Sequence, residues 1–234
     1  MSLLSLLQRS ADLLSLARPA SVIGSSDQQV RNLYALAIEE AKDLASSHNW
    51  QTLIREATFT TTAAAEQTGA VPGDLDRFIP NSFFNRSTRR PVLGPITPQL
   101  WQGIQANPQL NRVFLAFRER DGAFLVTPTP PAGQTIAYEY VTTKWARKSD
   151  ASVDYTEWQA DTDITYLDEW LITLGVRWRW KKSKGLPYGE DFDTYEKQRD
   201  QNRGRDGAAG AISLTGREYQ LGILPNLPEG NWNF

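Results

Sequence analysis

The chain of 234 residues contains no cysteine and a single histidine. The lack of cysteine excludes disulfides, thiolate nucleophiles and cysteine-ligated zinc, and one histidine excludes any site built on two imidazoles. Lys and Arg number 25 against 27 Asp and Glu, so the net charge of −2 shows no global excess of positive charge of the kind that nucleic-acid binders carry. The composition therefore predicts a protein that is not an enzyme and has no metal or organic cofactor.

Long hydrophobic runs are also missing. No apolar stretch approaches the roughly 20 residues that span a bilayer. The apolar N-terminal run is interrupted at Gln8 and Arg9 and has no basic segment before it, unlike a secretory signal peptide. We expect neither export by that route nor a membrane partner.

Aromatic residues, in contrast, are abundant. Eight Trp, eight Tyr and nine Phe make up 11% of the chain. Such side chains need either a core to fill or a partner surface to contact. With so little catalytic chemistry in the composition, this surplus points toward a protein that is surrounded by other proteins.

The first fifty residues have the pattern of two helices. Apolar residues recur at helical spacing over residues 3–17, and Pro19 ends that helix. Ser25, Ser26 and Asp27 offer N-caps for a second helix, whose apolar stripe runs from Val30 to His48. The short loop between them predicts an antiparallel helical hairpin.

The pattern then changes to short strands. Turn residues at 85–90 divide two of them, and a short helix is expected with Thr97 as N-cap and Pro98 in its first turn. Asp121-Gly122 predicts a hairpin, and with the alternating run at 136–140 it suggests three consecutive antiparallel strands that bury one face.

The last third returns to helices. We interpret residues 148–163 as a crossing loop, and Thr165 with Asp168 as a capping box that opens a helix ending at Gly185. A second helix follows from Pro187 to about Arg203. The fold class is therefore α+β: a helical bundle from both ends of the chain (1–55 and 164–203), an antiparallel β-rich insertion (56–163) and an extended C-terminal arm (204–234).

The arm combines helix-breaking Gly and Pro with large apolar side chains, which a flexible tail normally lacks. These side chains need a surface that buries them, on this chain or, as we favour, on a partner. They are Leu214, Tyr219, Leu221, Ile223, Leu224, Leu227, Trp232 and Phe234.

One dense cationic cluster occurs between residues 177 and 184. Basic residues alternating with tryptophan can hold a phosphate backbone, so a nucleic-acid-binding protein is the alternative function. The cations could equally gather at a helix C-terminus because the dipole favours them, or face an acidic patch on a neighbouring subunit. The candidates for contact with DNA or a subunit are Arg177, Arg179, Lys181, Lys182 and Lys184.

Other polar residues have ordinary structural explanations. His48 lies near a helix C-terminus, where we expect a structural role. The Asp-x-Asp pairs lack the glycine and distal glutamate of a calcium loop, so turns and caps explain them better. A glycosidase would need two converging carboxylates, and no pattern brings two together. The Asp pairs begin at Asp74, Asp161 and Asp191, and the carboxylates considered for catalysis are Glu139, Glu157, Asp161 and Glu169.

Four segments in this order carry a family resemblance. They are NWQTLIREATFTTTAAAEQ, VPGDLDRFIPNSFFNRSTRRPVLGPITPQLWQ, IAYEYVTTKW and DEWLITLGVRWRWKKSKGLPYGEDFDTYE. Together they resemble the head-to-tail adaptor proteins of short-tailed bacteriophages over most of residues 25–200.

This resemblance implies a structural virion protein at the head-to-tail junction, assembled in the host cytoplasm. Such proteins form a ring, generally of twelve subunits, between the portal and the tail nozzle. The ring extends the channel for double-stranded DNA, which passes without sequence specificity. The resemblance implies a helical core, β-structure on it and a C-terminal extension that clasps the portal. A tail fibre is a further candidate partner.

Overall fold

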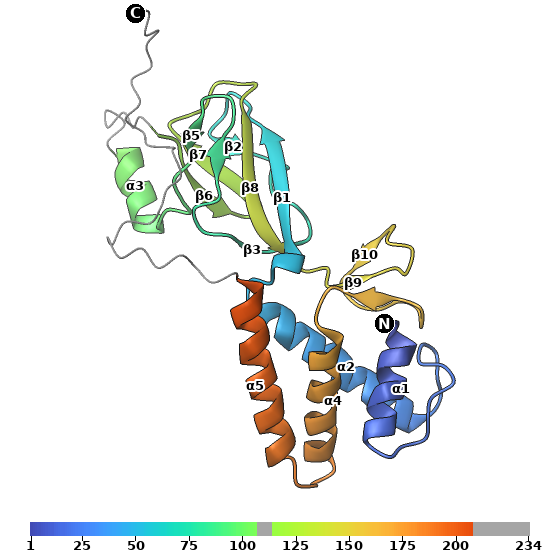
Figure 1. Cartoon of the computed structure of the whole chain (residues 1–234). Helices are drawn as coiled ribbons and strands as arrows, with labels where there is room; N and C mark the ends of the chain where they lie inside the picture. Colours follow the sequence, from blue (N-terminus) through green and yellow to red (C-terminus); the bar gives the residue numbers. More distant parts are fainter. Residues whose placement is uncertain (107–113, 208–234) are drawn as a thin grey trace, which may run out of the picture.

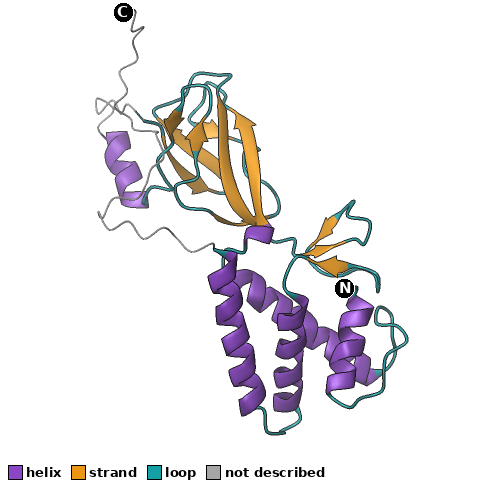
Figure 2. Ribbon diagram, in the orientation of Figure 1, coloured by secondary structure: helices purple, strands orange, loops and turns teal. Residues whose placement is uncertain are grey.

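The computed structural model describes residues 1–106 and 114–207 of the chain. Helices come mainly from the two ends of this sequence and strands from its middle, which confirms the α+β class and the helical bundle built from both ends (Figures 1 and 2). The helices are α1 (Leu3–Leu13), α2 (Gln28–Ser47), the 3₁₀ helix η1 (Gln51–Leu53), α3 (Pro98–Ala106), α4 (Glu169–Ser183) and α5 (Gly189–Asp206).

Four of these helices, α1, α2, α4 and α5, gather at one end of the molecule, and most strands form a separate β region at the other end (Figure 1). The short helix α3 lies beside the β region rather than in the bundle. The Thr97 hydroxyl accepts from the Leu100 amide at 3.2 Å, as the sequence predicts for the start of this helix.

The two predicted helices α1 and α2 are present, but they do not pair as a hairpin, because each packs chiefly against α4. One boundary also needs correction. Asp27 caps α2 by accepting from the Gln29 amide at 2.8 Å. Helix α1 ends at Leu13 instead of residue 17, because the chain turns at Ser15, which has a left-handed φ of 55°. Apolar spacing continues beyond this turn, so periodicity alone overestimates the helix.

Within the described residues, three antiparallel sheets make up the β-structure. The largest has the order β1-β8-β4-β5, with β3 also paired to β8, and the smaller ones are β2-β7-β6 and β10-β9-β11. The strands are β1 (Ile54–Thr60), β2 (Glu66–Gln67), β3 (Leu75–Phe78), β4 (Phe84–Asn85), β5 (Arg90–Pro91), β6 (Ala116–Arg120), β7 (Ala123–Thr127), β8 (Thr135–Thr142), β9 (Ala146–Arg147), β10 (Asp154–Tyr155) and β11 (Ile164–Thr165).

The Asp121-Gly122 hairpin joins β6 and β7 as predicted, with φ of 54° and 70° at its two loop residues. The prediction that a third consecutive strand continues this sheet was wrong. Strand β8 pairs with β1, β3 and β4, in a different sheet from β7. The loop between β7 and β8 contains three prolines, which cannot donate to a ladder, so the chain leaves the hairpin sheet there.

The expectation that these strands bury only one face of their sheet was also wrong. Consecutive residues of β7 and most residues of β8 are buried, so both faces of these strands are largely covered, although Glu139 in the middle of β8 is exposed. On one side lies the aromatic cluster of the β region, and Val141 near the end of β8 belongs instead to the core of the helices.

Residues 148–163 are more ordered than a crossing loop. They contain β10 and the Trp158 side chain, which is only 2% exposed and meets Trp145 edge-on at 4.6 Å between ring centroids. Both tryptophans belong to the core of the helical bundle. The small sheet β10-β9-β11 therefore packs with the helices.

Two predicted helix boundaries need correction. Thr165 is not a cap, because this residue belongs to strand β11. Asp168 instead caps α4, and its carboxylate accepts from the Leu171 amide at 2.7 Å. Helix α5 continues to Asp206, through the first residues of the predicted arm, because Gly204 is tolerated inside it. The rest of the arm, with all eight of its candidate residues, lies outside the described residues.

The aromatic surplus is largely used inside the molecule. Phe83 stacks on Tyr138 at 4.5 Å, and Phe117 and Phe124 pack edge-on in the same β core. In the described part of the chain, every aromatic side chain except Tyr188 and Phe192 is buried or half-buried. The inference that surplus rings mark partner surfaces thus needs correction, since most of them fill the two cores.

Candidate functional site

The basic cluster lies in the last turns of α4 and just beyond its end. Because successive residues of a helix are separated by about 100°, Arg177 and Lys181 share one side of α4 and Arg179 lies about 160° away from both. The cluster is thus divided between the two neighbouring helices, α5 and α2, rather than gathered in one positive patch.

Arg179 is bound to α2 through three carboxylates. Its Nε donates to Glu40 Oε2 at 2.7 Å, its Nη1 to Glu39 Oε1 at 2.6 Å, and its Nη2 to Asp43. The Arg179 side chain is 12% exposed and that of Glu40 is fully buried. This guanidinium clamps α4 against α2 and is not free to bind a phosphate.

Burial raises the pKa of Glu40 above its usual value, while hydrogen bonds from Tyr195 and Arg179 oppose that shift. Burial likewise raises the pKa of Tyr195, and the neighbouring Glu40 adds to the rise. Helices α2, α4 and α5 therefore meet at one buried carboxyl group.

On the other side of α4, Arg177 and Lys181 both pair with Asp191 in the first turn of α5. The Asp191 side chain is only 5% exposed. Two cations on one carboxylate connect the helices of the α4–α5 hairpin. Asp191 thus has a structural partner, in agreement with the interpretation of the Asp-x-Asp pairs as structural.

Lys182 and Lys184 differ from the other three cations. Among the described residues, neither has a carboxylate within ion-pair distance. Their ammonium groups lie over tryptophan rings, Lys182 at 5.6 Å from Trp178 and Lys184 at 5.9 Å from Trp180. These two are the members of the cluster that remain available for a partner.

A second polar site joins the bundle to the β region. Arg77 of β3 donates to Asn49 Oδ1 at 2.7 Å and to the carbonyl oxygens of Ala45 and His48 at 3.1 and 2.7 Å. The last carbonyls of a helix have no partner within it, so this arginine caps the C-terminus of α2 from another element. The His48 ring packs edge-on against Trp50 at 4.9 Å.

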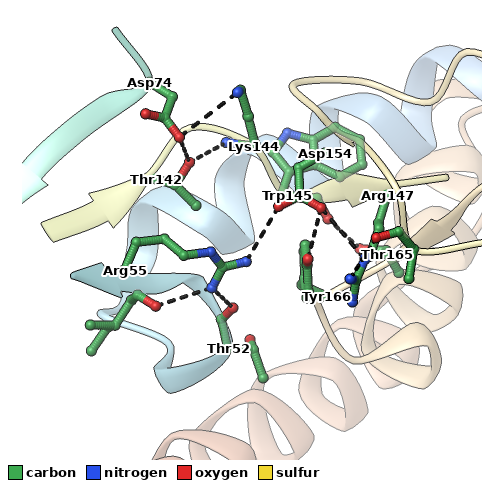
Figure 3. A network of polar contacts seen from close by, with 12 residues as sticks. Thr52, Arg55, Asp74, Thr142, Lys144, Trp145, Arg147, Asp154, Thr165 and Tyr166 are labelled. Carbon is green, nitrogen blue, oxygen red and sulfur yellow. Dashed lines mark hydrogen bonds and ion pairs between the residues drawn. The ribbon is translucent and has the colours of Figure 1, made fainter. Parts of the chain in front are cut away.

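Next to this joint, Asp154 of β10 contacts residues of β1, of β9 and of the segment that follows β11 (Figure 3). The Tyr166 hydroxyl donates to it at 2.8 Å, and the guanidiniums of Arg55 and Arg147 lie 3.8 and 3.6 Å away. Both guanidiniums also lie over the Tyr166 ring. The network connects β1 of the large sheet with the small sheet next to the helices.

Three of the four carboxylates considered for catalysis have separate structural partners, and the fourth, Glu139, is exposed in the middle of β8. Glu157 pairs with Lys42, Glu169 with the N-terminal amine, and Asp161 accepts from the amides of Val22 and Ile23. Within the described ranges, no group of three or more His, Asp and Glu side chains could hold a metal ion, and no helix is long and apolar enough to cross a membrane.

Sequence reasoning identified the basic cluster but missed the residues that partner it. The spacing of Glu39, Glu40 and Asp43 places these carboxylates on one face of α2, and this acidic face was the available signal for a cationic partner. Nothing in the sequence indicates that Arg77 reaches the end of α2, because that contact depends on how the β region sits on the bundle.

Comparison with known proteins supports the family resemblance. Individually curated proteins give no match to the chain. The family model described as SU10 adaptor protein, a phage structural adaptor, matches residues 1–223, which covers both the bundle and the β region. By this match the chain belongs to the SU10 adaptor protein family.

Proposed function

We propose that this adaptor forms a ring, generally of twelve copies, that joins the portal of the phage head to the tail nozzle. The ring extends the channel through which double-stranded DNA passes without sequence specificity. It is part of the virion at the head-to-tail junction and assembles in the host cytoplasm. The observation that carries the proposal is the family match over residues 1–223.

The fold is compatible with this role. The subunit has a helical bundle at one end and a β region at the other (Figure 1). The contacts of Arg77 and Asp154 join the two. Such a part can contact different proteins at its two ends. We propose three units: the bundle from 1–55 and 164–203, extended to Asp206 by α5 and joined by the small sheet β10-β9-β11; the rest of the insertion 56–163, available to the nozzle or a tail fibre; and the rest of the arm 204–234.

The arm is the proposed portal-binding element, through the apolar side chains between Leu214 and Phe234. Removal of residues 208–234 spares all the described helices and strands, so the truncated protein should still fold cooperatively, which a thermal melt followed by circular dichroism checks. We expect it to lose binding to the portal of the same phage. A matched control removes only 229–234, which tests whether Trp232 and Phe234 are needed. Portal binding by the truncated protein at unchanged affinity would refute the arm's role.

The nucleic-acid-binding alternative has less support, because Arg177, Arg179 and Lys181 are paired with carboxylates of the same chain. A channel wall that DNA slides past should not hold it strongly. We expect the purified protein to show little retention on DNA at physiological salt. Tight, salt-sensitive retention that disappears in K182E/K184E would favour the alternative.

A further inference from the structure

The turn between α4 and α5 carries an apolar and cationic surface that we call the hairpin tip, at the end of the bundle furthest from the β region (Figure 1). Its apolar members are 36–45% exposed. Tyr188 and Phe192 are the exposed aromatic side chains of the described residues. The hairpin tip consists of Lys182, Lys184, Leu186, Tyr188 and Phe192.

The rings of the hairpin tip are held in place from beneath. Trp178, which is 9% exposed, meets Phe192 edge-on at 5.1 Å and Tyr188 at 6.3 Å between centroids. Rings positioned in this way lose little conformational entropy when a partner covers them, which is typical of binding hot spots. Beside them, Lys182 and Lys184 have no carboxylate partner among the described residues. The complement of this surface is an apolar spot beside carboxylates whose negative charge exceeds that of the cations they pair with.

Helix α2 provides such a complement on its outer surface. Glu39, Glu40 and Asp43 share the single guanidinium of Arg179, so even with Glu40 protonated one negative charge is in excess. Glu39 and Asp43 are 58% and 59% exposed. Leu36, which is half-buried, precedes Glu39 by three residues and lies on the same surface. We call Leu36, Glu39 and Asp43 the α2 face.

We propose that the hairpin tip of one copy binds the α2 face of a second copy. This inference rests on the proposed ring and names the surfaces through which its neighbours contact each other. Two lysines meet two carboxylates, and the exposed rings cover an apolar side chain, which gives the charged rim and apolar centre of a specific interface. DNA is a poorer occupant, because a phosphate backbone has no apolar counterpart for Leu186 and the rings.

Charge exchange tests the contact directly. One variant, K182E/K184E, reverses the hairpin tip, and another, E39K/D43K, reverses the α2 face. Each should need at least about tenfold more protein than the wild type to saturate the portal, since like charges meet at every neighbour contact. An equal mixture should saturate as the wild type does, because every contact in an alternating ring again joins opposite charges. Mass photometry of adaptor on portal measures the saturation.

The control R89E/R120E makes the same change of charge as K182E/K184E, on exposed arginines of the β region, and should assemble normally. If E39K/D43K does not fold, judged by circular dichroism, E39K replaces it, because Glu40 and Asp43 still hold Arg179. Wild-type saturation by K182E/K184E, or failure of the mixture to recover, overturns the contact while leaving the ring itself intact. Absence of any wild-type ring would instead refute the proposed function.

Discussion

The Nε of Arg179 donates to Oε2 of Glu40 across 2.7 Å, and the Glu40 side chain has no exposed surface. This pair joins α4 to α2 inside the bundle. Arg179→Met leaves the buried carboxyl group without its cation, and we expect a loss of about 3–5 kcal/mol in the free energy of unfolding.

Urea denaturation of Arg179→Met measures this loss. The control is Arg86→Met, which breaks a surface pair with Glu56 whose side chains are both about half exposed, and should cost less than about 1 kcal/mol. Equal costs for the two variants would show that the clamp does not stabilise the bundle.

The pH dependence of Glu40 follows from its raised pKa. Because burial makes the folded protein hold this proton more tightly than the unfolded chain, Glu40 contributes most to stability below its ordinary pKa. That contribution falls as the pH rises through the raised pKa. The stability of the wild type relative to Glu40→Gln should therefore decrease with increasing pH across this window. Paired urea titrations measure the difference, and an increase with pH would contradict the shift.

Gly175 of α4 lies against the same carboxyl group. A Cβ at this position would overlap Cδ and Cγ of Glu40, which Arg179 holds in place. Gly175→Ala should therefore destabilise the protein by about 1–3 kcal/mol despite the better helix propensity of alanine. Gly204→Ala in α5, where a Cβ meets nothing within 4 Å, should instead be neutral or stabilise by up to about 1 kcal/mol. Thermal melts of both variants test this prediction. Stabilisation by both substitutions would refute the close contact between Gly175 and the Glu40 side chain.

Arg77 is predicted to hold the β region on the bundle. Arg77→Met leaves the last carbonyls of α2 without this donor, and we expect a cost of about 1–3 kcal/mol and faster hydrogen exchange in that turn. Arg77→Lys retains a positive charge but not the fork of donors, so it should recover only part of the loss. Unchanged exchange between residues 44 and 53 would contradict the capping role.

Local patterns predicted the parts of this fold that depend on neighbouring residues. Apolar periodicity and Asp27 located α2, and Asp121-Gly122 located the β6–β7 hairpin, because caps and tight turns are encoded within a few residues. The pairing of β8 with β1 could not be read in this way, since it joins residues about eighty positions apart. Long-range pairings are selected by burial in the whole fold.

In the candidate site, too, local features could be predicted and long-range contacts could not. The sequence displays the cations of α4, but their partners Glu40 and Asp191 are found only when α2 and α5 pack on either side of that helix. Their pairing neutralises three of the five cations, Arg177, Arg179 and Lys181, within the bundle. What remains exposed, Lys182 and Lys184 beside Tyr188 and Phe192, is a different surface from the continuous basic run that the sequence suggests.

The most direct test of the adaptor role is the mass of the complex that the full-length protein forms with the portal of the same phage. Native mass spectrometry or electron microscopy of the mixture should show a closed ring of this chain on the portal, with about one adaptor for each portal subunit. A protein that stays monomeric and unbound in the presence of folded portal would contradict the account.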